Sequence, residues 1–155
     1  MKKIVTITGH RNSGKVNLAS KLSENSEVYF IKPYTDSDIV TGDFNYVSKS
    51  KLDQMIKDEE LLSCTRINEH RYCFFKSQLQ NGYNIMIVDD YALVDVRSRW
   101  NGSIYSIKVW NENQDDSDRV GVYLYDHEFD EVFKYGLDDV DELEWRIGSN
   151  ECQDR

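Results

Sequence analysis

Proline is almost absent from this sequence, which contains only Pro33, and no apolar stretch approaches the roughly 18 residues that a membrane-spanning helix needs. The first ten residues, MKKIVTITGH, lack the apolar core and the small-residue cleavage site of a signal peptide. Cysteine is scarce, and Cys64, Cys73 and Cys152 form no CxxC pair, which argues against a disulfide framework and a metal site. We therefore expect a cytoplasmic protein with reduced thiols and no membrane partner.

Basic residues are outnumbered, since 19 Lys and Arg stand against 28 Asp and Glu, for a net charge of −9. The block from Glu112 to Arg155 carries 15 acidic and 4 basic residues, hence −11, so the preceding part carries +2. We expect no direct binding to nucleic acid, because affinity for its phosphates comes from Lys and Arg. Three interpretations of the acidic block stand: a solvated surface that favours solubility, a face that binds a basic protein partner, or a surface that mimics the charge of a nucleic acid.

The order of apolar patterns predicts a single domain over 1–149, followed by a polar tail at 150–155. The polar C-terminal residues 148–155 are expected to be frayed. Strands are expected at 2–9, 26–34, 44–47, 83–90, 103–110 and 130–136, and a strand that turns into a helix at 70–82. Helices are expected at 14–25, 48–62, 91–100 and 137–147. The alternation predicts an α/β fold, a three-layer sandwich with a mostly parallel sheet. Helix residues expected to face the core are Val16, Leu18, Ala19, Leu22, Leu52, Met55, Ile56, Leu61, Leu137, Val140, Leu143 and Ile147.

The most informative motif is Gly9-x-x-x-x-Gly14-Lys15, which lies between the first expected strand and the first expected helix. In such a P-loop the glycines let backbone N–H groups converge on phosphate oxygens, the helix N-terminus adds positive potential, and the lysine reaches the β- and γ-phosphates. This strand–loop–helix context predicts a site for nucleotide phosphates such as those of ATP, with Lys15 also catalytic, and the alternative is a Gly-containing turn with a solvated lysine. The residues expected to bind ATP are Gly9, Arg11, Asn12, Ser13, Gly14, Lys15, Val16 and Asn17.

Val16 occupies the position at which a P-loop normally offers Ser or Thr to Mg²⁺. The backbone donors of the loop do not need that hydroxyl, so we expect phosphate binding to survive and Mg²⁺ binding to be weakened. Asn17 does not replace the hydroxyl, because its side chain leaves the helix in another direction. Asp89 and Asp90, at the end of the expected strand 83–90, either hold Mg²⁺ directly or through water, or cap the next helix.

In order along nearly the whole chain, these segments resemble the guanylate kinase family. ITGHRNSGKVNLASKL resembles its P-loop and first helix, TGDFNYVS its GMP-binding segment, INEHRYCF the part that follows, YNIMIVDD its Asp-x-Asp strand, and FDEVFKYGLDDVDEL its last strand and helix. The resemblance implies a P-loop NTPase-like fold in which ATP donates a phosphoryl group to GMP or to another ribo- or deoxyribonucleoside monophosphate.

The resemblance also implies acceptor-binding residues. Tyr72 stands at the position of a tyrosine that touches the GMP phosphate, and Thr35 at a position in a Thr-Thr-Arg turn. Phe44 replaces a phosphate-binding tyrosine, and Ser63 replaces the glutamate that reads guanine. With Asp90, these residues form the expected acceptor site, and Asp89 is the second expected catalytic residue.

Two parts of the family pattern are missing from this sequence. Asp36 and Asp38 stand where the family has two arginines that clamp the GMP phosphate, and they would repel a phosphate. The family's arginine-bearing lid is reduced here to residues 111–128, with Arg119 and His127 as its basic residues.

Three hypotheses about function follow. The first is a divergent nucleoside monophosphate kinase that uses ATP. The second is a guanylate kinase-like module that has lost catalysis and acts by binding a protein. The third is an acidic inhibitor that binds a basic partner through Asp138, Asp139, Asp141, Glu142 and Glu144.

Overall fold

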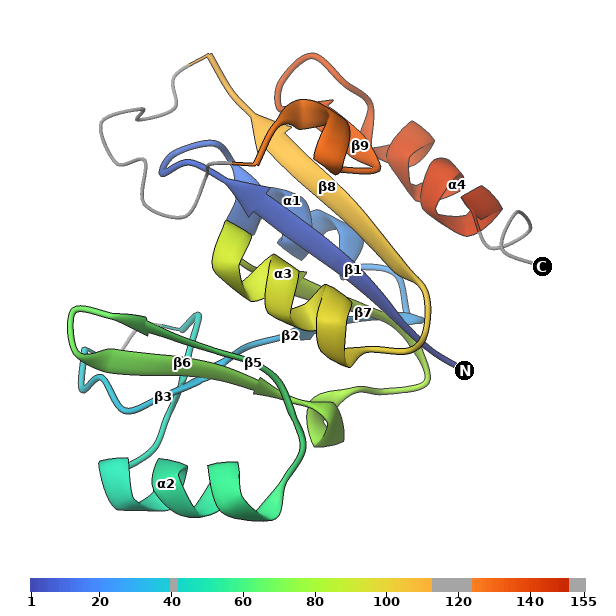
Figure 1. Ribbon diagram of the computed structural model, residues 1–155. Helices are drawn as coiled ribbons and strands as arrows, with labels where there is room; N and C mark the ends of the chain where they lie inside the picture. The colour runs from blue at the N-terminus through green and yellow to red at the C-terminus, as the bar shows by residue number, and fades with distance from the viewer. Residues whose placement is uncertain (40–41, 113–123, 151–155) are drawn as a thin grey trace.

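A computed structural model describes residues 1–39, 42–112 and 124–150 (Figure 1). Its strands are β1 (Lys2–Gly9), β2 (Val28–Ile31), β3 (Tyr34–Thr35), β4 (Asn45–Tyr46), β5 (Leu61–Ile67), β6 (His70–Phe75), β7 (Gly82–Ile87), β8 (Ile104–Trp110) and β9 (Glu131–Lys134). Its α-helices are α1 (Lys15–Leu22), α2 (Lys49–Asp58), α3 (Asp90–Arg99) and α4 (Val140–Asn150), and two single 3₁₀ turns lie at Lys76–Gln78 and Asp126–Glu128.

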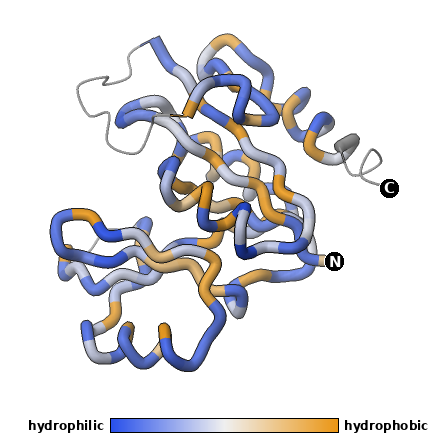
Figure 2. Tube along the Cα trace, in the orientation of Figure 1, coloured by the Kyte–Doolittle hydropathy of each residue, from blue (hydrophilic) through white to orange (hydrophobic). Residues whose placement is uncertain are grey.

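The main sheet is parallel throughout, with strand order β2-β7-β1-β8-β9. Side chains alternate between the two faces of its central strand. Val5 and Ile7 pack with α1 and α4 on one face, whereas Ile4 packs with α3 on the other. Figure 2 shows apolar residues concentrated along the strands and helix faces of this region. The sheet lies between two helical layers, so the predicted three-layer α/β sandwich is confirmed.

A second, smaller sheet lies beside α3 and β2 (Figure 1) and has strand order β4-β3-β6-β5. Its β3–β6 and β5–β6 pairs are antiparallel, whereas β3 and β4 pair in parallel. Helix α2 covers one face of this sheet and buries Leu52 and Met55 against Cys73 and Phe75. This mixed sheet was not predicted, because antiparallel pairing between short segments leaves little trace in local periodicity.

The expected helix at 48–62 is too long. Ser48 caps α2, since its hydroxyl accepts a hydrogen bond from the Lys51 N–H at 3.2 Å. The helix ends at Asp58, and Leu61 begins β5 instead of continuing the helical face. Hydrogen bonds from the neighbouring strand β6 favour the extended conformation here, and no local pattern reveals them.

Three other expectations are wrong. The helix expected up to Gly82 is only the 3₁₀ turn at Lys76–Gln78, and Gly82 opens β7. Leu137 is 76% exposed because α4 begins three residues after it, so it lies off the helix face that was expected to bury it. The C-terminal residues expected to fray continue α4 to Asn150, and 151–155 lie outside the described residues.

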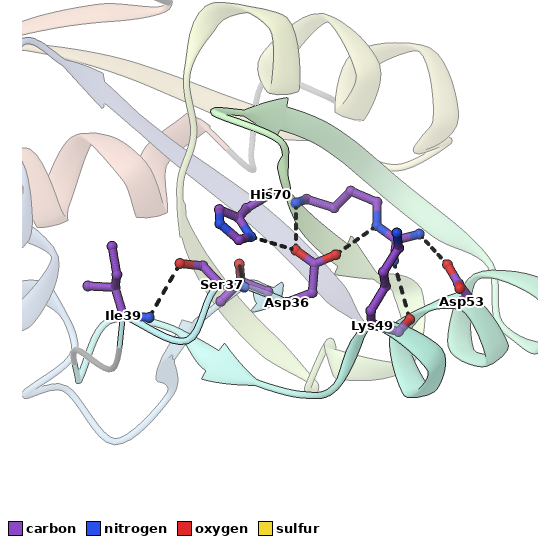
Figure 3. A network of polar contacts seen from close by, with 8 residues as sticks. Asp36, Ser37, Ile39, Lys49, Asp53 and His70 are labelled. Atoms are coloured by element: carbon purple, nitrogen blue, oxygen red, sulfur yellow. Dashed lines mark hydrogen bonds and ion pairs between the residues drawn. The ribbon is translucent and has the colours of Figure 1, made fainter.

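Asp36, which stands where the resembling family has an arginine, is held in a polar network (Figure 3). Its carboxylate accepts hydrogen bonds from the Arg71 backbone N–H at 2.9 Å and from the Arg71 Nε at 3.1 Å, and His70 Nδ1 lies 3.5 Å away. Burial alone would raise the pKa of Asp36, but the hydrogen bonds and charge of Arg71 outweigh it, so the pKa is lowered.

We predict that Asp36→Asn lowers the free energy of unfolding by about 1–3 kcal/mol at neutral pH, because it removes charge-assisted hydrogen bonds. The pKa of Asp36 is lower in the folded protein than in the unfolded chain, so its contribution is fully present above the unfolded pKa of about 3.9 and is lost progressively as pH falls from there through the folded pKa. Urea unfolding from pH 7 to pH 3 measures whether the free energies of unfolding of wild type and variant approach each other as pH falls. Asp38→Asn, at an exposed neighbouring position, is the control, and a pH-independent gap for Asp36→Asn would contradict the prediction.

Candidate functional site

The P-loop begins at the carboxyl end of β1 and closes at the first turn of α1. Asn12 and Gly14 have positive φ angles of 61° and 94°, and the Ser13 N–H donates to the His10 carbonyl at 3.1 Å. A side chain at Gly9 would overlap the hydroxyl of the buried Ser13 and force that side chain to move. This curled backbone, followed directly by a helix N-terminus, is the geometry that binds phosphates.

Lys15, the first residue of α1, folds back over the loop. Its Nζ donates to the Gly9 carbonyl oxygen at 2.9 Å. It borders two adjoining cavities, here called the loop cavity and the acceptor cavity, with volumes of 590 Å³ and 410 Å³. The ammonium group is therefore placed between a site formed by the P-loop and a second site beside it.

The loop cavity gathers seven of the eight residues expected to bind ATP, and Ser13 is buried beneath them. Val16 was expected to face the core, but it is 37% exposed and borders both cavities, because the first turn of α1 opens onto the site and not onto the sheet. The residues around the loop cavity are Gly9, His10, Arg11, Asn12, Gly14, Lys15, Val16, Asn17, Phe44 and Ile67.

Of the two interpretations given to Asp89, the cap of the next helix is confirmed. It is the N-cap of α3, with its carboxylate accepting from the Ala92 N–H at 2.7 Å, and it also lines the acceptor cavity. Burial raises the pKa of Asp89, while the N–H donors of Ala92 and Tyr91 and the positive charge of Lys15 act in the opposite direction. A carboxylate on a cavity that Lys15 also borders is suited to a hydrated cation.

Asp90 and Thr35 are placed outside the acceptor cavity. The Asp90 carboxylate is fully buried and accepts from the Leu124 N–H at 2.6 Å, which ties the start of α3 to the segment before β9. Thr35 is 1% exposed, and its hydroxyl accepts from the Ser37 N–H at 3.1 Å. Both residues have structural contacts in this arrangement.

Phe44, Ser63 and Tyr72 line the acceptor cavity from the smaller sheet and its connecting loop. The Phe44 and Tyr72 rings lie 5.2 Å apart at 60°. Phe74, which the family resemblance places where a small hydroxyl residue contacts the base, also lines the cavity. The sequence missed most of the remaining wall, because nothing in the local pattern distinguishes these residues from ordinary core or loop residues. They are Phe30, Ile31, Pro33, Asp43, Thr65, Ile67, Ile87, Val88 and Ala92.

Within residues 1–39, 42–112 and 124–150, no three His, Cys, Asp or Glu side chains are grouped so as to hold a metal ion. No helix among these residues has the length and apolarity to cross a bilayer. The expected reduced lid falls mainly on 113–123, which lie outside the described residues.

The sequence matches no family model and no curated protein. Among solved structures, the fold is similar to the crystal structure of guanylate kinase from Anaplasma phagocytophilum, with a TM-score of 0.69 and 13% sequence identity. The match covers 97% of this chain and 85% of that chain. The chain thus has a guanylate kinase-like P-loop NTPase fold.

Proposed function

We propose that this protein binds ATP at the P-loop and transfers its γ-phosphoryl group to a second molecule in the acceptor cavity. The observation that carries the proposal is the position of Lys15, which borders both cavities on a loop whose backbone is curled for phosphate. A phosphoryl group that passes from one cavity to the other would remain beside this ammonium group, which offsets its charge.

Residues of the P-loop would make most of the contacts to ATP. The backbone N–H groups from Gly9 to Lys15 would hold the phosphates, and Lys15 would exchange its hydrogen bond with the Gly9 carbonyl for a phosphate oxygen. Mg²⁺ bound with ATP would neutralise phosphate charge. Asp89 lines the acceptor cavity and would hold this ion through water, since Mg²⁺ keeps several water ligands and needs only one or two carboxylates from the protein.

Calorimetric titration with ATP, with and without Mg²⁺, tests the proposal, followed by detection of ADP in the presence of each nucleoside and nucleoside monophosphate, GMP included. Saturable ATP binding and acceptor-dependent ADP formation are the expected results. The absence of ATP binding would overturn it.

A second candidate function is that of a non-catalytic module that binds a basic protein partner. It is favoured by α4, where Trp145 is 71% exposed among the acidic residues Asp141, Glu142 and Glu144. An exposed tryptophan is a feature of protein interfaces, and the acidic residues around it would complement a basic partner. This candidate predicts salt-sensitive binding to a basic protein that Trp145→Ala weakens, whereas ADP formation dependent on an acceptor would favour the first.

We predict that Val16→Thr strengthens the Mg²⁺ dependence of ATP binding, because it restores a hydroxyl at the first turn of α1, where Val16 faces both cavities. The affinity for ATP in the presence of Mg²⁺ should rise by roughly three- to tenfold, the effect of one added hydrogen-bonding ligand. Titration of both proteins with ATP, at zero and at saturating Mg²⁺, measures the change. Val16→Ala is the control that alters size without adding an oxygen, and an equal gain with it would contradict the prediction.

A further inference from the structure

The charges around the acceptor cavity do not suit a phosphate-bearing acceptor. Among the described residues that line it, Lys15 is the single cation and lies at the border with the loop cavity, where the donor's phosphates are also expected. The acidic residues of the wall are Asp43 and Asp89. A phosphate monoester brings a charge of about −1.5 to −2 at pH 7, and holding it here without a further cation would be costly.

The arginines of the smaller sheet do not supply that cation. Arg71 alternates with Tyr72, which lines the cavity, so its side chain leaves β6 on the opposite face. Its guanidinium group is bound there by Asp36, by Asp53 at 2.6 Å and by the Lys49 carbonyl at 3.3 Å (Figure 3). Arg66, which is paired with Arg71 in the sheet, lines a separate hollow beside α3 with Tyr91 and Asp95 and is not among the residues that line the acceptor cavity.

The same wall is well suited to an uncharged ring that carries polar groups. Phe44 and Tyr72 present two rings 5.2 Å apart, and Phe74 adds a third. Ser63 is fully buried, and its hydroxyl has no hydrogen-bond partner in the part of the chain that the structure describes. A buried hydroxyl in a cavity wall gains a hydrogen bond when a ligand supplies the partner.

We propose that the acceptor cavity binds an uncharged nucleoside, whose hydroxyl group receives the phosphoryl group. This inference rests on the proposed function for its donor. The acceptor hydroxyl oxygen forms a bond to the γ-phosphorus of ATP, and the bond between that phosphorus and the β,γ-bridging oxygen breaks. ADP leaves with the electron pair, the hydroxyl proton passes to solvent, and the products are a nucleoside monophosphate and ADP.

Binding of nucleosides and of their 5′-monophosphates is to be compared by calorimetry on the full chain, using the adenine, guanine, cytosine, uracil and thymine compounds at low ionic strength. At least one nucleoside should bind about tenfold or more tightly than its monophosphate. Ser63→Ala should lower the affinity for that nucleoside by roughly three- to tenfold, because one hydrogen bond is lost. Ser20→Ala, an exposed serine in α1, should leave it unchanged. A monophosphate that binds more tightly than every nucleoside, or no binding of any nucleoside, would overturn the inference.

ATP titration and ³¹P NMR separate this inference from the proposed function. If ATP and a nucleoside bind and nucleoside monophosphate forms, both stand. ATP binding together with transfer only to monophosphates would overturn the inference and leave the proposed function in place. Nucleoside binding without ATP binding would overturn the proposed function and the transfer step, while the ligand class of the cavity would stand.

Discussion

Lys15→Ala is expected to lower the affinity for ATP by roughly 10- to 150-fold, which corresponds to the 1.5–3 kcal/mol of a hydrogen bond to a charged group. Lys15 is held over the loop by its bond to the Gly9 carbonyl and borders both cavities, so no other described cation occupies the same place. Calorimetric titration with ATP measures the loss. Any acceptor-dependent ADP formation should fall at least as far, because the lysine also offsets charge during transfer.

Lys21→Ala is the matched control for this variant. Lys21 lies in the last turn of the same helix and is exposed, so its removal changes the net charge equally but leaves the P-loop intact. Circular dichroism and the urea midpoint should be alike for both variants. ATP binding that is unchanged in Lys15→Ala, or lost equally in Lys21→Ala, would show that the loop does not hold the phosphates as proposed.

The sequence was sufficient to predict the P-loop and the main sheet because both depend on local signals. Glycines at fixed spacing, a β-branched strand before them and an amphipathic helix after them specify β1 and α1. The smaller sheet was not foreseen, because β5 and β6 stabilise each other only once paired. The helical spacing of apolar residues in 48–62 therefore led to a predicted helix that includes Leu61, the first residue of β5.

The candidate site was predicted in part for the same reason. Residues adjacent to the P-loop in sequence are also adjacent to it in space, so local reasoning placed them. Ser63 and Tyr72 reach the cavity through long-range sheet pairing, and only the family resemblance pointed to them. Asp90 was expected in the acceptor site, but its carboxylate binds the backbone N–H of Leu124 instead. That partner lies 34 positions away in the sequence, so no local pattern could reveal it.

Gly14→Ala should be the most damaging single-methyl change in the P-loop. Gly14 has a φ of 94°, a left-handed conformation that costs an alanine about 1–2 kcal/mol. In addition, a Cβ atom there would lie 2.7 Å from the Tyr135 ring, which packs against the core shared by α1 and α4. Overpacking of this kind costs about a further 1–3 kcal/mol, and relief by movement of the loop would disturb its N–H groups. We expect lower stability in urea and weaker ATP binding together.

Gly136→Ala separates the two causes. Gly136 has a similar φ of 88°, but nothing lies within 4 Å of the position of an added Cβ. It should therefore lose only the conformational part of the stability and keep full ATP affinity. If the two variants unfold at the same urea concentration, the Tyr135 contact contributes nothing. If Gly14→Ala is less stable but binds ATP normally, then the curvature of the loop tolerates a side chain at its helix end, and phosphate binding depends on Gly9 and Lys15 instead.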